Sequence, residues 1–394
     1  MRRELFPELQ SKLLTDLQKA HKKNKLSSNG HRFVDIKGIE GLVHFSLERY
    51  KQGGDYFQQT AQFTEGLDSA EVKSWILMDI QDKSYAKVSD CLLKVSGSRL
   101  YSGNHISEKV KMYAQEQTQN LISSYSGCQL CLPFADSAVE IYEANSAEIL
   151  LFDDEICAKR QKEVRDPAYV KSHPRVYTTI MEVQKPLPFD LNGLNSPTNK
   201  PEATFDYLTN GYGVPNWTIQ TALCCWFSAQ YGNVRLPIVA ITDGAKDIRL
   251  RLNSVFGGQI IIILDWYHLN KKIWRFLTMI AHNKAQKLED GKNIVHLLWE
   301  GRTDETIMYL KNMTPKNKEK HKELIIYLEN HKEEIINYKN RKHANKTIGA
   351  GRAEKGVDMV VAQRQKNKPI AWSKNGSYAL STLRADYLNL KNAA

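Results

Sequence analysis

The sequence predicts an α/β protein in which a mixed sheet is interrupted by an all-helical insertion and preceded by a mainly helical N-terminal region. Two apolar, β-branched runs, Pro237–Thr242 and Ile260–Leu264, are separated by residues at helical spacing that end at Gly257-Gly258. From His268 onward the periodicity is helical. A strand–helix–strand unit followed by a long helical stretch predicts this fold class.

The composition of the chain indicates which broad class of protein it belongs to. Of the 394 residues, 42% are hydrophobic and 25% are charged, as in globular proteins with more than one structural unit. No apolar run approaches the roughly 18 residues that span a bilayer, and the first residues lack a signal-peptide core. We therefore expect a cytoplasmic protein with no membrane partner. The six cysteines are irregularly spaced, and Cys128-x-x-Cys131 is only half of a zinc motif, so no metal is assigned there.

The charge is distributed unevenly along the chain. The net charge is +11, yet residues 1–265 contain 30 basic and 31 acidic side chains, whereas residues 266–394 contain 25 and 13. Such asymmetry is typical of a protein that binds a polyanion, and a passive basic surface is the alternative. We favour nucleic acid as the partner.

Residues 1–145 form the predicted N-terminal region. A strand-like run lies at Gly41–Ser46, and residues 70–145 are mainly helical. Short helices joined by tight turns suit a helix-turn-helix that binds DNA ends, and they suit a plain helical packing region equally well. The region opens with four leucines at helical spacing: Leu5, Leu9, Leu13 and Leu17.

The first strand of the sheet is predicted at Glu148–Lys159, and its apolar start leads directly into two aspartates. Because side chains alternate along a strand, Asp154 lies on the side of Ile156, whereas Asp153 lies on the side of Glu155. Asp154 is therefore the better candidate for an acid that projects from an apolar face, and Asp153 is the alternative first acid.

Two further aspartates follow the later strands. An antiparallel strand at Val176–Val183, a strand at Ala203–Leu208 and a helix at Thr218–Tyr231 come before the two apolar runs, which end on Asp243 and Asp265. Polar residues just past the C-terminal ends of parallel strands point into the crevice where such sheets carry out chemistry. A turn that caps the next helix is the alternative for Asp243.

Residues 266–346 form the predicted all-helical insertion. Its first helix has an apolar stripe that contains Leu269 and Ile273, with Lys271, Lys272 and Arg275 on the opposite side as candidate DNA-binding residues. Later helices are predicted at Ile294–Trp299, Glu305–Leu310 and Leu324–Tyr338.

Residues 347–394 form the last predicted part of the core. Valines at helical spacing, from Val357 to Val361, mark a helix that packs on the sheet and places Glu354 in its first turn, facing the strand ends. Gly349-x-Gly351 lacks the spacing and the Lys-Ser/Thr of a phosphate loop. We expect these glycines to let the start of the helix lie close to the strands.

Three carboxylates thus become candidates for one site: Asp154, Asp243 and Glu354. Carboxylates are the hard oxygen ligands that hold two Mg²⁺ ions about 4 Å apart, and Mn²⁺ is the expected substitute. In such a pair one ion activates the attacking oxygen, and the other stabilises the leaving 3′ oxygen of a phosphodiester.

Over roughly residues 148–390, the chain resembles DDE-type insertion-sequence transposases, relatives of the Mutator-like group. The order and spacing of four motifs carry the resemblance: Asp243-Gly244, Leu264-Asp-Trp-Tyr-His-Leu269, Ile348-Gly-Ala-Gly-Arg-Ala-Glu354, and Ala371-Trp-Ser-Lys-Asn-Gly376 with Leu383-Arg384. It implies an RNase H-like core formed by residues 146–265 and 347–394, with the three carboxylates as catalytic metal ligands. Arg364 and Arg384 are then further candidates for DNA binding.

The resemblance also implies the partners. They are double-stranded DNA, as element ends and as target, and further copies of this chain, as a homodimer or a higher oligomer on DNA in the bacterial nucleoid. Relatives often have Cys-x-x-His where this chain has Asp265-x-x-His268, so these two residues touch the metals, orient DNA or cap a helix. A nuclease or resolvase without strand transfer, and an inactive DNA-binding regulator, are the alternative functions.

Overall fold

The computed structural model describes most of the chain, and the described residues form two compact units, Met1–Tyr113 and Ala114–Ala394. The division falls inside a helix, upstream of the boundary expected at residues 145 and 146. The leucine repeat of the first seventeen residues and the pair Cys128 and Cys131 lie outside the described residues. The structure describes residues 15, 28–39, 41–50, 68–123, 140–144, 146, 148–161, 174–186, 203–215, 217–231, 237–366 and 370–393.

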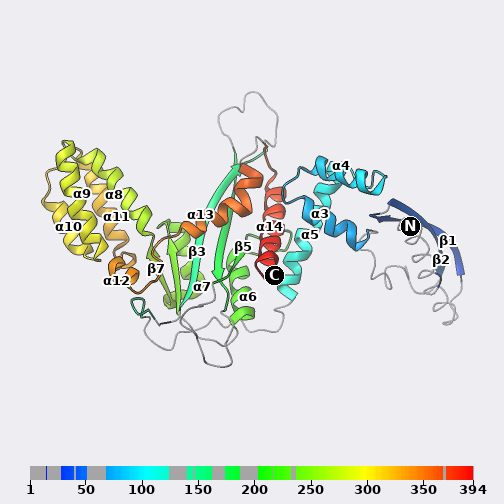
Figure 1. The fold of residues 1–394 in the computed structure, drawn as a ribbon, viewed down its shortest axis with the longest axis horizontal. Helices are drawn as coiled ribbons and strands as arrows, with labels where there is room; N and C mark the ends of the chain where they lie inside the picture. The colour runs from blue at the N-terminus through cyan, green and yellow to red at the C-terminus, as the bar shows by residue number, and fades with distance from the viewer. Residues whose placement is uncertain are drawn as a thin grey trace. The chain divides into compact units, whose positions relative to one another are not determined.

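The first unit combines a hairpin with short helices (Figure 1). The predicted strand at Gly41–Ser46 is confirmed as part of an antiparallel pair. Serine side chains cap two of the helices, because Ser69 accepts a hydrogen bond from the backbone of Val72 and Ser84 does so from Lys87. The elements are β1 (Ser28–Gly38), β2 (Gly41–Tyr50), α3 (Ala70–Asp79), α4 (Tyr85–Ser96) and α5 (Gly103–Ser123), which continues into the second unit.

The second unit is built on a five-stranded mixed sheet with the order β5-β4-β3-β6-β7. β4 is antiparallel to both β3 and β5, whereas β3, β6 and β7 are parallel to one another. The predicted sequence of three strands, a helix, a strand, a helix and a strand is confirmed. The strands are β3 (Ile149–Lys159), β4 (Arg175–Gln184), β5 (Phe205–Thr209), β6 (Ile238–Thr242) and β7 (Ile260–Leu264).

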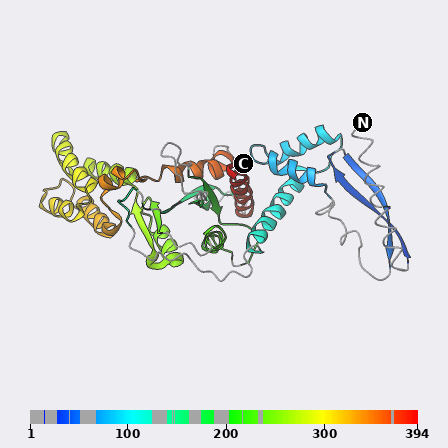
Figure 2. The same ribbon diagram turned by 60° about the horizontal axis from the view of Figure 1, so that its bottom comes forward.

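Alternation along the strands gives the sheet two covered faces. One face, which includes Leu151 and Ala240, packs against helices α6 and α7. The other includes Phe152 and Ile156 and packs against helix α13 and the π-helix that continues it. Figure 2 shows α13 and α6 on opposite sides of the sheet. The covering elements are α6 (Ile219–Tyr231), α7 (Lys246–Phe256), α13 (Gly351–Val357), the π-helix (Asp358–Lys366) and α14 (Lys374–Ala393).

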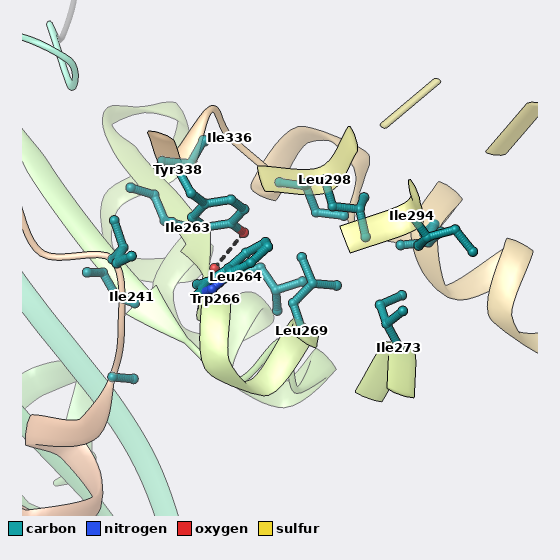
Figure 3. Close-up of a cluster of buried hydrophobic side chains, with 14 of the residues drawn as sticks. Ile241, Ile263, Leu264, Trp266, Leu269, Ile273, Ile294, Leu298, Ile336 and Tyr338 are labelled. Carbon is teal, nitrogen blue, oxygen red and sulfur yellow. Dashed lines mark hydrogen bonds between the residues drawn. The ribbon is translucent and has the colours of Figure 1, made fainter. Parts of the chain in front are cut away.

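The predicted insertion between β7 and α13 is helical and shares its core with the sheet. The apolar stripe of its first helix is fully buried, and Figure 3 shows Leu269 and Ile273 packed with side chains of the next helix. The hydroxyl of Tyr338 donates to the carbonyl of Leu264, which ties the end of the insertion to β7. The helices are α8 (Trp266–Ile280), α9 (Lys284–Trp299), α10 (Thr303–Asn312), α11 (Lys318–Asn330) and α12 (Tyr338–His343).

One predicted helix is corrected by the structure. The expected helix at Leu324–Tyr338 ends at Asn330, and a short 3-10 turn at Lys332–Glu334 follows. At this break His331 and Glu334 bond each other and Arg249 of α7, so the segment after Asn330 is held by tertiary contacts with α7. Within the described part of the chain, no helix combines the length and the apolar character that crossing a bilayer requires.

Candidate active site

The two consecutive aspartates of β3 lie on opposite faces of the sheet. Asp153 is almost completely buried, and its carboxylate accepts two hydrogen bonds from Arg251 of α7, at 2.9 Å and 2.7 Å. Burial raises the pKa of Asp153 to about 6, and Arg251 opposes that shift. Asp154 lies on the other face and is only partly buried, as the parity argument expects. Asp153 is thus occupied by an ion pair, whereas the Asp154 carboxylate interacts electrostatically with Asp243 and Glu354.

Asp243 follows the last residue of β6, next to Asp154. In the parallel register of β3 and β6, Phe152 pairs with Ile241, so continuing each strand by two residues brings Asp154 alongside Asp243. The Asp243 carboxylate accepts a hydrogen bond from the backbone of Ala245 at 2.9 Å, which fixes the turn. Gly244 has a φ of +83° and lies so close to His331 that a Cβ would be 2.8 Å from the imidazole.

Glu354 approaches the same place from helix α13. It lies in the first turn of that helix, as predicted, and its side chain is 63% exposed. His268 of α8 lies beside it, with 3.5 Å between His268 Nε2 and Glu354 Oε1. The helix therefore carries a carboxylate over the strand ends, where it remains accessible to a ligand.

The three carboxylates interact electrostatically. Burial raises the pKa of Asp154, and the negative charges of Asp243 and Glu354 raise it further, while a backbone hydrogen bond and His268 oppose the shift. Such a cluster of like charges is the environment that a divalent cation neutralises. Among the described residues, no three His, Cys, Asp or Glu side chains lie close enough to share a single ion. Mg²⁺ is usually bound through one or two carboxylates and keeps several waters, so three protein ligands at one point are not a requirement for it.

Asp265 has a structural role in this arrangement. Its buried carboxylate accepts a hydrogen bond from the backbone of His268 at 2.8 Å, which caps helix α8, and a second one from the backbone of Ala350. Ala350 lies 85 residues later in the chain and leads directly into the helix of Glu354. Asp265 thus holds the end of β7, the start of α8 and the segment before Glu354 together.

Sequence reasoning missed a second contact that positions the helix of Glu354. Glu182 of β4 is 1% exposed, and its carboxylate pairs with Arg352 at 3.1 Å. Burial raises the pKa of Glu182 to about 7, and Arg352 opposes the shift. The Arg352 guanidinium also lies 4.1 Å from the ring centroid of Phe205. A lone glutamate within the apolar strand Val176–Val183 was the available signal.

The role predicted for the glycines is corrected by the structure. Gly349 is packed against Tyr267 of helix α8, and a Cβ at Gly351 would meet open space. The glycine that lets α13 approach the strands is Gly356, where a Cβ would lie 2.9 Å from Tyr207 and 3.1 Å from Glu182. Close packing of a helix on a sheet is decided by tertiary contacts, which a glycine spacing does not encode.

The predicted basic side of α8 is exposed and lies near the carboxylates. Lys271, Lys272 and Arg275 are all exposed. The ammonium of Lys272 lies 3.8 Å from the ring centroid of Tyr327 in α11. Desolvation lowers the pKa of Lys272, and the negative charge of Asp243 opposes that shift. The insertion thereby brings a cation next to an acid of the site.

Two other predicted DNA-binding residues are inside the fold, which corrects that expectation. Arg364 is 2% exposed, and its guanidinium lies 5.3 Å from the ring centroid of Trp372, which is itself buried. Arg384 is 7% exposed and donates to the backbone carbonyls of Met359 and Val360. Arg384 thus bonds carbonyls along the π-helix, and neither guanidinium lies on a surface that meets phosphates.

Comparison with known proteins adds little to this description. No family model matches the chain, and no curated protein matches it. Among solved structures, the chain is weakly similar to one described as the Drosophila P element transposase strand transfer complex. The identity is 12%, the TM-score is 0.24, and the match covers 85% of this chain and 82% of that chain.

Proposed function

We propose that the second unit is an RNase H-like, divalent-metal-dependent enzyme that cleaves phosphodiester bonds. The observation that supports this proposal is that Asp154 in the middle of β3, Asp243 just after β6 and Glu354 in helix α13 form one electrostatic cluster. The strand order and directions of this sheet support the assignment. Within this class, we propose a DNA transposase, which cuts at the ends of its element and joins the freed 3′-OH to target DNA.

The proposed chemistry assigns a task to each group. Two Mg²⁺ ions, held by Asp154, Asp243 and Glu354, would supply activation of the attacking oxygen and stabilisation of the leaving 3′ oxygen. Asp265 and the pair of Glu182 and Arg352 act as positioning residues, because their contacts hold the elements that carry the acids. Each acid must be ionised to bind a cation, so the raised pKa of Asp154 favours binding at neutral rather than acidic pH.

The basic insertion supports DNA as the substrate. Residues 266–350 contain 17 basic and 10 acidic side chains, and Lys272 of α8 interacts electrostatically with Asp243. In this proposal Lys272 contacts a phosphate near the scissile bond, because its ammonium packs on Tyr327 and interacts electrostatically with Asp243. A transposase must hold two element ends at once, so a homodimer or higher oligomer on DNA is part of the proposal.

The test uses the full chain and the DNA that flanks its reading frame. Inverted repeats in that DNA would provide duplex substrates, and strand cleavage and joining to a target plasmid would be measured with Mg²⁺, Mn²⁺ or Ca²⁺. We expect both activities with Mg²⁺ or Mn²⁺ and neither with Ca²⁺. Asp243→Asn should abolish both, whereas the matched control Asp247→Asn, an exposed acid on α7, should keep them. Cleavage without joining would assign a nuclease, and DNA binding without either would assign a regulator.

A further inference from the structure

A cluster of three side chains joins the helical insertion to helix α7. His331 Nδ1 lies 2.6 Å from a carboxylate oxygen of Glu334 and 2.8 Å from the guanidinium of Arg249. Arg249 also pairs with the other carboxylate oxygen of Glu334, at 2.5 Å. His331 and Glu334 are each 7% exposed, at the start and the end of the turn that follows α11. Because the two opposite charges hold each other and both bond the imidazole, this His331 cluster fixes the position of the ring.

The imidazole ring of His331 lies against the turn that carries Asp243. A Cβ at Gly244 would lie 2.8 Å from His331 Cε1 and 2.7 Å from the side chain of Leu264. The turn is therefore enclosed between the end of β7 on one side and the His331 ring on the other. Arg249 lies near the start of α7, the helix that leaves this turn. The His331 cluster thus contacts the turn directly and is also tied to the helix that follows it.

Two more side chains of the insertion lie in the electrostatic environment of Asp243. The centroid of the Tyr327 ring, from α11, is 4.5 Å from that of His331, and the ammonium of Lys272 lies 3.8 Å from the Tyr327 centroid. Burial raises the pKa of Tyr327, and the charge of Asp243 adds to that shift. The same charge opposes the lowering of the Lys272 pKa by desolvation. The insertion therefore meets the Asp243 turn through packing and through charge.

We infer that His331 is a positioning residue that fixes the Asp243 carboxylate for metal binding, which makes the insertion a part of the candidate active site as well as a DNA-binding surface. The inference rests on the proposed function. Asp243 is exposed and lies one residue beyond the pairing of β6 with β7. Its bond with the backbone of Ala245 stays within the turn. The His331 ring supplies a contact from outside the turn, and loss of a group that orients a metal ligand lowers metal affinity by roughly 10- to 100-fold.

The first experiment measures Mn²⁺ binding to the full chain by electron paramagnetic resonance, without DNA. We expect His331→Ala to weaken binding by roughly 10- to 100-fold. The matched control His296→Ala, an exposed histidine on α9, should bind as the wild type does. Glu334→Gln keeps the ring and weakens its tether, so it should shift the affinity in the same direction by less. Glu334→Gln decides the question if His331→Ala does not fold. Wild-type Mn²⁺ affinity in the folded variants would overturn the inference.

The Mg²⁺ dependence of DNA cleavage separates positioning from a general loss of structure. Loss of positioning at His331 should raise the Mg²⁺ concentration at half-maximal rate, again by roughly 10- to 100-fold, while excess Mg²⁺ restores most of the rate. A protein that is only destabilised has fewer active molecules, so its maximal rate falls and its half-maximal Mg²⁺ concentration does not change. That second pattern in His331→Ala would assign the residue a purely structural role and overturn the inference.

Hydrogen exchange in the metal-free protein distinguishes failure of this inference from failure of the proposed function. The backbone amides of Gly244 and Ala245 donate within the turn, to Thr242 Oγ1 and to the Asp243 carboxylate. We expect both amides to exchange faster in His331→Ala than in His296→Ala, because the turn loses its outer contact. Unchanged exchange would overturn the positioning role alone. A wild type that binds Mn²⁺ but cleaves no DNA would contradict the proposed function and leave the positioning of Asp243 in place.

Discussion

The consecutive residues Asp153 and Asp154 lie on opposite faces of the central sheet, in opposite electrostatic environments. On one face Asp153 is enclosed and neutralised by Arg251, and on the other Asp154 lies with Asp243 and Glu354 in a cluster of like charge. The enclosed pair holds α7 to β3, whereas the open cluster leaves its charge to be balanced by a ligand. Adjacent residues of identical chemistry are therefore separated into a structural and a candidate catalytic role by the alternation of a strand.

The largest expected effect is on the rate of DNA cleavage, and it comes from substitution of Asp154 on the face that carries the carboxylate cluster. Asp154→Asn should lower cleavage by about a thousandfold or more, because several kcal/mol of charge stabilisation by a bound metal would be lost. Its thermal unfolding should remain close to that of the wild type, since no buried cation loses its partner. Rates of DNA cleavage with Mg²⁺ measure this, with the exposed neighbour Glu155→Gln as the matched control. Wild-type rates in Asp154→Asn would remove the residue from the site.

On the enclosed face, a substitution should lower the stability of the fold instead of the rate of cleavage. Asp153→Asn leaves the guanidinium of Arg251 buried without its carboxylate, which should lower the free energy of unfolding by about 3–5 kcal/mol. Urea denaturation measures this loss. The double variant Asp153→Asn with Arg251→Met should recover much of it, because the unpaired charge is gone. If Asp153→Asn were stable and inactive, the assignment of the two faces would have to be exchanged.

The buried carboxylate of Glu182 should make the stability of the fold depend on pH. Burial raises the pKa of Glu182 from 4.5 to about 7, so the folded state binds its proton more tightly than the unfolded state. The stability from this proton is fully present below pH 4.5 and is lost as pH rises through about 7, a change of about 3 kcal/mol. Glu182→Gln should flatten the decrease between these values in urea denaturation at several pH values. An unchanged decrease would contradict the assignment.

The basic side chains also divide into an exposed group on α8 and the buried Arg384, and we expect a smaller effect, on the salt dependence of DNA binding. Replacing Lys271, Lys272 and Arg275 with Gln should reduce the log–log salt slope of duplex binding by roughly two to three units, if each neutralises one phosphate. Arg384→Gln should leave that slope unchanged and lower the melting temperature, because this guanidinium bonds the carbonyls of Met359 and Val360. A triple variant with the wild-type slope would move the DNA-binding surface to the N-terminal unit.

Patterns that depend on neighbouring residues could be predicted from the sequence alone. The alternation around Asp154, the apolar runs that end on Asp243 and Asp265, and the stripe of α8 each follow from local periodicity, and the strand order along the chain agrees with them. The position of Glu354 in the first turn of its helix has the same origin. These features are local, so the chain encodes them within a few residues.

Features that join distant residues were decided only by the tertiary structure. Asp265 bonds the backbone of Ala350, Glu182 pairs with Arg352, and the predicted helix at Leu324–Tyr338 stops where His331 contacts α7. The burial of Arg384, which removed it from the DNA-binding candidates, is of this kind as well. The physical reason is that burial and ion pairing depend on which surfaces meet after folding, and no spacing along the chain specifies that meeting.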